Sequence, residues 1–318
     1  MIMTGTFIAV LKVIIGFVLL YFGGDWLVNG GVSLARRFRI SPLVIGLTIV
    51  AFGTSAPELL VSMTSAIKGS AGIAMGNVLG SNVANIGLIL GLTAMLCPII
   101  TRNSRIIANG LVMIAASVLV LLFSLNNGIS RIEGLILFIS IVAFTVISIY
   151  TGRTRKDDMP ESDAPDREMK VIWAVLLIIL ACLMLSFGAD FMVDGATVLA
   201  QAIGVSDKVI GLTVVALGTS LPELAASVAA AIKKEMDISI GNIIGSNIFN
   251  LLCVLGVSAS IRPISFNFEQ YLTDYIILMV FSVGLLLLVK PWRKEGRLGR
   301  LSGLVMFAAY AVYAWSLF

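Results

Sequence analysis

Two copies of one short polar motif lie inside apolar stretches of this 318-residue chain. The first copy, Gly53–Glu58, reads GTSAPE, and the second, Gly218–Glu223, reads GTSLPE. Each glutamate is expected about three residues past the middle of an apolar run that could cross a bilayer, or about 5 Å from its centre. A carboxylate at that depth is costly and normally faces a bundle interior or an ion path. Hydroxyls, carbonyls and carboxylates are oxygen ligands that suit calcium, and two glutamates would neutralise its charge.

A proline precedes each of these glutamates. Pro57 has no N–H to donate to the carbonyl of Gly53, and Pro222 withholds the same bond from Gly218. We therefore expect a kink at each motif. Carbonyl oxygens freed inside a membrane must find a partner, and a cation is a suitable one.

A second polar motif follows each first one. Ser81 and Asn85 are four residues apart, as are Ser246 and Asn250, so each pair would share one face of a helix. Glycines four apart in the same motifs predict close approach of another helix; they are Gly76 with Gly80 and Gly241 with Gly245. The remaining asparagines of this region could equally form interhelical hydrogen bonds; they are Asn77, Asn82, Asn242 and Asn247.

These motifs belong to an internal repeat. Residues 46–91 align with residues 211–256 at a constant offset of 165 without a gap, and 24 of the 46 pairs are identical. A duplicated scaffold without transport is the plainer alternative, but the matching residues are polar ones that are expensive in a membrane. The repeat therefore indicates a transporter rather than a structural duplication.

The hydropathy pattern predicts an all-α membrane protein of ten transmembrane helices. The expected spans are 6–30, 42–67, 71–97, 104–125, 130–150, 170–200, 207–232, 237–261, 270–290 and 299–317. Residues 1–150 would form a first five-helix repeat, 151–169 a polar linker, and 170–318 a second repeat. Because five is odd, the second repeat would be inverted, an architecture that places a substrate site near the midplane at the repeat interface.

The distribution of basic residues sets the predicted orientation. Loops after spans 1, 3, 5, 7 and 9 hold 17 of the 22 lysines and arginines. Because cytoplasmic loops are enriched in these residues, we expect both termini outside and the central linker in the cytoplasm of a multi-pass plasma-membrane protein. The N-terminus is expected to be a first transmembrane helix rather than a cleaved signal.

Composition excludes several other classes. The chain is 58% hydrophobic and only 13% charged, which disfavours soluble and fibrous proteins. It has no histidine, so imidazole metal sites and histidine-based catalytic pairs are absent. The three cysteines, Cys97, Cys182 and Cys253, have unrelated spacings and are expected to be buried small hydrophobes. A net charge of +4 spread over short loops predicts no nucleic-acid partner.

Three further acids lie at membrane level. Asp25 and Asp190 match in the repeat, whereas Asp194 matches Asn29. They are expected near the ends of spans 1 and 6. End-capping or interfacial roles are favoured for them over a role in ion entry.

At the two motif pairs the chain resembles the cation/calcium exchanger superfamily, and most closely the prokaryotic sodium/calcium exchangers. The GTS-(A/L)-PE and GN-x-x-GSN segments are similar to that family's two α-repeats. The resemblance implies exchange of calcium against sodium by alternating access, typically with three sodium ions per calcium ion. It also implies that spans 1 and 6 slide past the other helices, and that no enzyme activity is involved.

The resemblance also implies a set of metal-ion ligands, six from each half. In the first half they are the carbonyl of Ala51 with the side chains of Thr54, Ser55, Glu58, Ser81 and Asn85. In the second half they are the carbonyl of Ala216 with the side chains of Thr219, Ser220, Glu223, Ser246 and Asn250. Calcium and sodium would be transported ions rather than cofactors. The lipid bilayer is the other expected partner, with no obligatory protein partner.

One departure and three alternatives bear on this interpretation. Several relatives, including potassium-dependent exchangers, carry aspartate where this chain has Asn250, which disfavours potassium dependence. Calcium/proton exchange, or another cation/proton exchange, is the alternative within transport because a glutamate can carry protons; the GN-x-x-E pattern usual in that branch is not found. Intramembrane hydrolysis is disfavoured because the chain has no histidine and no convincing paired-aspartate motif. A passive channel is disfavoured by inverted repeats around an acidic centre.

Overall fold

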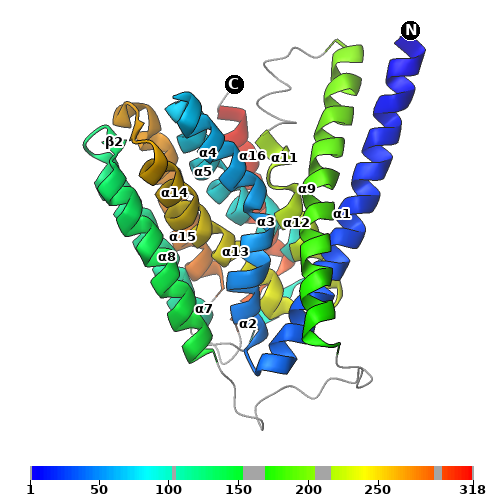
Figure 1. Cartoon of the computed structure of the whole chain (residues 1–318), viewed down its shortest axis with the longest axis horizontal. Coiled ribbons are helices and arrows are strands. Elements are labelled where there is room, and N and C mark those ends of the chain that lie inside the picture. Colours follow the sequence, from blue (N-terminus) through cyan, green and yellow to red (C-terminus); the bar gives the residue numbers. More distant parts are fainter. Residues whose placement is uncertain (1, 102–104, 153–168, 205–215, 290–295, 317–318) are drawn as a thin grey trace.

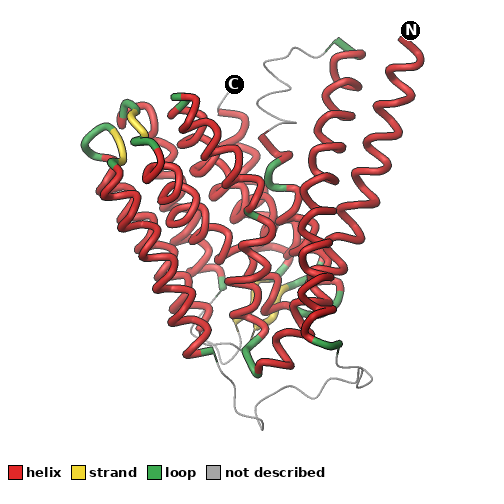
Figure 2. The backbone as a smooth tube through the Cα atoms, viewed as in Figure 1, coloured by secondary structure: helices red, strands yellow, loops and turns green. Residues whose placement is uncertain are grey.

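The computed structural model describes residues 2–101, 105–152, 169–204, 216–289 and 296–316. Almost all of these residues are helical, and the helices run roughly along one common direction (Figures 1 and 2). The predicted linker, 151–169, lies almost entirely outside the described residues. The prediction of a mostly helical membrane protein is confirmed for the part of the chain that is described, which also contains four short strands that the sequence did not predict.

The described elements follow the chain in this order. The helical ones are α1 (Ile2–Phe38), α2 (Pro42–Ile45), η1 (Gly46–Val50), α3 (Ala51–Thr54), α4 (Ala56–Lys68), α5 (Ala71–Ala84), η2 (Asn85–Leu90), α6 (Gly91–Leu96), α7 (Arg105–Ser124), α8 (Arg131–Thr151), α9 (Val171–Ala202), α11 (Ala216–Gly218), α12 (Leu221–Ile232), α13 (Met236–Phe249), η5 (Asn250–Val254), α14 (Leu255–Ile261), η6 (Phe268–Tyr271), α15 (Leu272–Leu288) and α16 (Arg300–Ser316). The strands are β1 (Ile99–Thr101), β2 (Gly128–Ile129), β3 (Ile264–Ser265) and β4 (Gly296–Leu298).

Seven described helices are long and apolar enough to cross a membrane, and the bent pair Pro42–Thr54 and Ala56–Lys68 makes an eighth. Two predicted spans are not among these eight. Of span 207–232, only Ala216–Gly218 and Leu221–Ile232 are described as helix, and span 299–317 is the 17-residue α16. Large apolar side chains such as Phe17 and Trp173 are more than 60% exposed, as expected of surfaces that face lipid.

Helices α1 and α9 form a long pair at one side of the molecule (Figure 1). Glycines allow their backbones to touch. A Cβ added at Gly30 would lie 3.1 Å from the carbonyl oxygen of Ala174, and one added at Gly195 would lie 2.6 Å from that of Ala9. Gly30 and Gly195 match in the repeat, and so do Ala9 and Ala174. The two contacts are therefore equivalent, with the roles of the helices exchanged.

The centre of the molecule is the continuous run α13–η5–α14, which is almost entirely buried. A Cβ added at Gly241 would lie 2.7 Å from the carbonyl oxygen of Leu43, and one at Gly245 would lie 2.6 Å from that of Leu47. The close approach predicted for these two glycines is confirmed, whereas no described atom lies within 4 Å of a Cβ added at Gly76 or Gly80, the other predicted pair. The segment equivalent to 43–51 in the second half, 208–216, falls almost entirely outside the described residues.

Two short antiparallel ladders join the halves at their ends. Strand β1 pairs with β4, with Ile99 opposite Leu298, and β2 pairs with β3, with Ile129 opposite Ile264. Each ladder contains one strand from residues 1–150 and one from residues 170–318. The ladders therefore link loops of the two halves rather than loops within one half.

Candidate ion-binding site

The two glutamate motifs break their helices in the same way. Helix α3 ends at Thr54, and Ser55 separates it from α4 with φ −87° and ψ 8°. Thr219 and Ser220 separate α11 from α12, and Ser220 has φ −91° and ψ 1°. The axes before and after the first break differ by 49°, so the kink predicted there is confirmed. Both prolines occupy the first turn of the helix that follows, where a missing N–H costs nothing.

Each break places its glutamate at a helix N-terminus. Glu58 lies in the first turn of α4 and Glu223 in the first turn of α12. The unpaired N–H groups of a first turn carry partial positive charge, which favours a carboxylate there. The local sequence thus stabilises an acidic side chain in an otherwise apolar bundle.

The site is closed to solvent. Glu58 and Glu223 are both 0% exposed. Seven further predicted ligands are also buried; they are Thr54, Ser55, Ser81, Asn85, Ser220, Ser246 and Asn250. Thr219 is partly buried. Burial of so many polar groups costs free energy unless each finds a partner, so the cluster is unlike an ordinary bundle core.

Hydrogen bonds from the first break cross to the second half. The Ser55 hydroxyl donates to Glu223 Oε1 over 2.8 Å. Thr54 Oγ1 lies 3.2 Å from Asn242 Oδ1 and 3.4 Å from Ser246 Oγ. Residues about 170 to 190 positions apart therefore meet at one point, as the repeat predicts.

Several oxygens at this point have no partner among the described residues. Both carboxylate oxygens of Glu58 are unpaired, as are Oε2 of Glu223, the hydroxyl of Ser220 and the amide oxygens of Asn85 and Asn250. Buried polar atoms in proteins are nearly always paired. A set of unpaired carboxylate, hydroxyl and amide oxygens is a donor set that a hard cation such as calcium or sodium would satisfy.

The remaining predicted ligands differ in their surroundings. The Ala51 carbonyl accepts from the Ser55 N–H over 3.0 Å and from Thr54 Oγ1 over 3.3 Å. Ala216 begins α11, so its backbone is described but its side chain is not. Asn85 and Asn250 each begin a π-helical turn, η2 and η5, a distortion often found at functional sites.

Two matched contacts near the glutamates were not assigned by sequence. Asn77 Nδ2 donates to Ser62 Oγ over 2.9 Å and to the Glu58 carbonyl over 3.3 Å. Asn242 Nδ2 makes the same two bonds to Ser227 Oγ and the Glu223 carbonyl, over 2.9 and 3.4 Å. A signal was present, because each serine lies four residues after its glutamate in both copies of the repeat.

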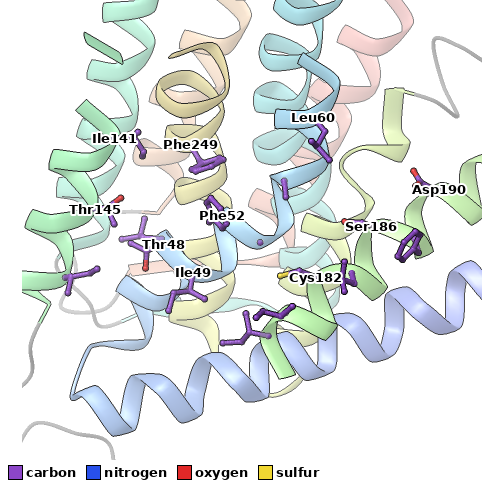
Figure 3. Close-up of a pocket in the computed structure, with 18 residues that line it drawn as sticks. Thr48, Ile49, Phe52, Leu60, Ile141, Thr145, Cys182, Ser186, Asp190 and Phe249 are labelled. Carbon is purple, nitrogen blue, oxygen red and sulfur yellow. The ribbon is translucent and has the colours of Figure 1, made fainter. Parts of the chain in front are cut away.

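Two of the three other membrane-level acids form ion pairs. Asp25 Oδ1 lies 2.6 Å from Lys233 Nζ, and Asp194 Oδ2 lies 3.2 Å from Lys12 Nζ. Asp190 instead lines a cavity of about 730 Å³ between the η1–α4 segment, α8 and α9 (Figure 3). Gly53 and Ala56, which flank the first break, also line this mostly apolar cavity.

Comparison with known proteins agrees with this geometry. The sodium/calcium exchanger protein family matches residues 8–150 and 173–318, almost the whole chain. The chain belongs to that family. The family consists of transporters rather than enzymes, and the resemblance noted at the two motifs is confirmed.

Similar proteins cover the full length of the chain. The putative antiporter CaxA of Alkalimonas amylolytica is 39% identical over 98% of this chain and 99% of its own. The sodium/calcium exchanger MaX1 of Methanosarcina acetivorans is 31% identical over 97% of this chain and 98% of its own. A solved structure of the sodium-calcium exchanger NCX_Mj, soaked with Na⁺ and Sr²⁺, superposes with a TM-score of 0.84. It is 34% identical and covers 98% of this chain and 99% of that one.

Proposed function

We propose that this protein exchanges sodium for calcium across a membrane by alternating access. One observation carries the proposal: two fully buried glutamates, one from each half, lie among buried hydroxyls and amides with carboxylate oxygens that no described residue pairs. A buried carboxylate without a partner is strongly disfavoured, so a cation bound between them would stabilise the site. Membership of the exchanger family and similarity to exchangers named for sodium and calcium support the same function.

The proposed ion ligands are the twelve groups that the family resemblance implies. Glu58 and Glu223 would bind calcium centrally and also serve sodium. The crossing bonds of Thr54 and Ser55 support this set, because they bring ligands of both halves within hydrogen-bonding distance. With only two carboxylates, a site holding three Na⁺ would carry one more positive charge than a site holding one Ca²⁺. The exchange would therefore be electrogenic.

The proposed architecture is ten spans in two inverted repeats, 1–150 and 170–318, joined by the linker 151–169. The exchanged contacts of Gly30 and Gly195 support it, since inverted repeats make equivalent contacts in pairs. The matched bonds of Asn77 and Asn242 support it as well. We further propose a plasma-membrane location with both termini outside, on the distribution of basic residues alone.

Calcium-45 uptake into sodium-loaded proteoliposomes tests the function, with and without an imposed membrane potential. Sodium-dependent uptake that responds to the potential is expected. Uptake driven by a pH gradient without sodium would indicate calcium/proton exchange at the same site. No calcium flux under any sodium gradient would refute the proposal, provided that the protein is folded in the liposomes.

A further inference from the structure

The polar contacts behind the two glutamates form matched clamps between neighbouring helices. Helix α4 carries Glu58 and Ser62, and α5 carries Asn77; helices α12 and α13 carry the equivalent groups. Each asparagine amide donates both to the glutamate's own carbonyl and to a serine hydroxyl one turn further along the same helix. Two hydrogen bonds from one amide to successive turns restrain the glutamate-bearing helix against both rotation about its axis and translation along it.

We propose that Asn77 and Asn242 are positioning residues for the ion site, an inference that rests on the proposed function. They do not need to contact the ion. Each fixes the first turn of a short helix that begins at a break, and the carboxylate direction follows from the rotation of that turn. Asn242 also accepts from Thr54 through Oδ1 over 3.2 Å, so it links the clamp of one half to the crossing bonds of the other.

Calcium KM and maximal uptake rate, measured for N77L and S62A, separate positioning from folding. Asn77→Leu keeps the side-chain volume and removes both bonds. Calcium KM should rise about fivefold, the factor that the net contribution of one hydrogen bond represents. Maximal rate and protein amount should change little, while the unfolding temperature should fall modestly, because two acceptors lose their donor. The double variant S62A/N77L should be no worse than N77L, because both act on one clamp.

Asn109→Leu is the matched control, since Asn109 Nδ2 donates to the Arg105 carbonyl on α7, within a single helix. Its KM should stay at the wild-type value. An unchanged KM in N77L and N242L, with a lower protein amount or unfolding temperature, would overturn the proposal in favour of a purely structural role. If the leucine variants do not fold, S62A and S227A give the same test with one acceptor removed.

A second inference rests on the ion pair between α1 and α12. Lys233, at the C-terminal end of α12, lies 2.6 Å from Asp25 Oδ1 and donates to Asn29 Oδ1 over 2.6 Å. Nearby, a Cβ added at Gly24 would lie 2.7 Å from the Ala225 carbonyl oxygen, so the two backbones touch. The pair closes the contact between the helices at this point.

The equivalent contact, between α9 and α4, is not closed by an ion pair in the described structure. The residues that match Asp25 and Lys233 are Asp190 and Lys68, and no ion pair joins these two in the described structure. Leu60 of α4 and Asp190 of α9 instead line the 730 Å³ cavity (Figure 3). The site shows the same asymmetry, because the Ser55 hydroxyl donates to Glu223 whereas the Ser220 hydroxyl has no partner in the described part of the chain.

We infer that the two ion pairs form in turn. Asp25–Lys233 holds α1 against α12 in this conformation, and Asp190–Lys68 holds α9 against α4 in the opposite one. Asp194, which replaces Asn29 in the second half, would add a second acid for Lys68. The inference rests on the proposed alternation, in which α1 and α9 stay paired through their glycine contacts.

Cross-linking of paired cysteines tests the exchange, in a chain whose three native cysteines are replaced by alanine. A short bifunctional thiol reagent should link D25C to K233C and, in a separate variant, D190C to K68C. Each cross-link should lower the rate of calcium uptake at least tenfold, and cleavage of the cross-link should restore the rate. The pair K12C/D194C is the control: it joins α1 to α9 and should cross-link without stopping uptake.

The outcomes distinguish this inference from the proposed function. Failure of D190C/K68C to cross-link in protein that still takes up calcium would overturn the exchange of ion pairs alone. Absence of sodium-dependent uptake before any reagent is added, in folded protein, would overturn the proposed function first.

Discussion

In the first half of the chain, the hydroxyl of Ser55 reaches across the molecule and donates to Glu223. In the second half, Ser220 holds the equivalent position, yet its hydroxyl and both carboxylate oxygens of Glu58 have no partner among the described residues. Nearly identical motifs therefore occupy different environments. Tertiary packing, rather than the sequence of the motif, determines the environment of each one. The protein holds one glutamate through Ser55, and the other has no such bond among the described residues.

The largest expected effect comes from neutralising either glutamate. Glu58→Gln and Glu223→Gln should each lower calcium uptake about a hundredfold or more, because a buried charge is removed from a site that has only two. Uptake of calcium-45 at matched protein amounts checks this. Wild-type uptake in either variant would show that the site lies elsewhere.

The same two variants also sharpen the comparison through stability. In ion-free detergent, E58Q should unfold at a higher temperature than E223Q. The Glu58 carboxylate has no partner among the described residues, so its replacement costs no bond. Replacement of Glu223 gives up a charge-assisted bond from Ser55. Equal unfolding temperatures would mean that the two environments are alike without ions.

A smaller effect is expected where the halves pack together. Gly245→Ala should destabilise the protein by about 2 kcal/mol, because the added methyl group meets the backbone of Leu47 rather than a flexible side chain. Chemical denaturation in detergent measures the change. Gly284→Ala in α15 is the control, since no described atom lies within 4 Å of its added Cβ.

The Ser55 hydroxyl, which donates to Glu223 of the other half, should contribute somewhat less to the free energy of unfolding. Ser55→Ala should lower the ion-free stability by about 1.5 kcal/mol, the lower end for a bond to a charged group, whereas Ser220→Ala should change it little. The same denaturation assay compares the two variants. A loss in S220A as large as that in S55A would remove the asymmetry on which the comparison rests.

The exposed ion pair should matter least. Lys12→Ala removes the partner of Asp194, but the two side chains are 39% and 62% exposed, and such pairs contribute less than about 1 kcal/mol. Uptake and unfolding temperature should both stay near their wild-type values. A marked loss of uptake in K12A would indicate a role beyond pairing α1 with α9.

Much of the site could be predicted from sequence because the repeat presents each residue twice. The kink before Glu58 followed from proline chemistry, and the close approach at Gly241 and Gly245 followed from their spacing. Local sequence could not reveal that Asn77 clamps Glu58, because an asparagine facing an ion and one facing a helix have the same spacing.

The asymmetry between the halves was beyond the sequence for a physical reason. A 24-in-46 identity makes the two motifs almost interchangeable as sequences, so no local rule distinguishes Ser55 from Ser220. Whether Ser55 or Ser220 reaches a glutamate depends on the distance between neighbouring helices in one conformation. That property belongs to the assembled bundle rather than to either motif.

The short ladders between the halves have a consequence for biogenesis. Ile99 pairs with Leu298 and Ile129 with Ile264, so the N-terminal loops pair only with strands made much later. The ribosome must reach residues 296–298 before β1 meets its partner, although earlier helices can already be in the bilayer. The ladders therefore close only after most of the second half has been made, and two separately made halves would need each other to complete them.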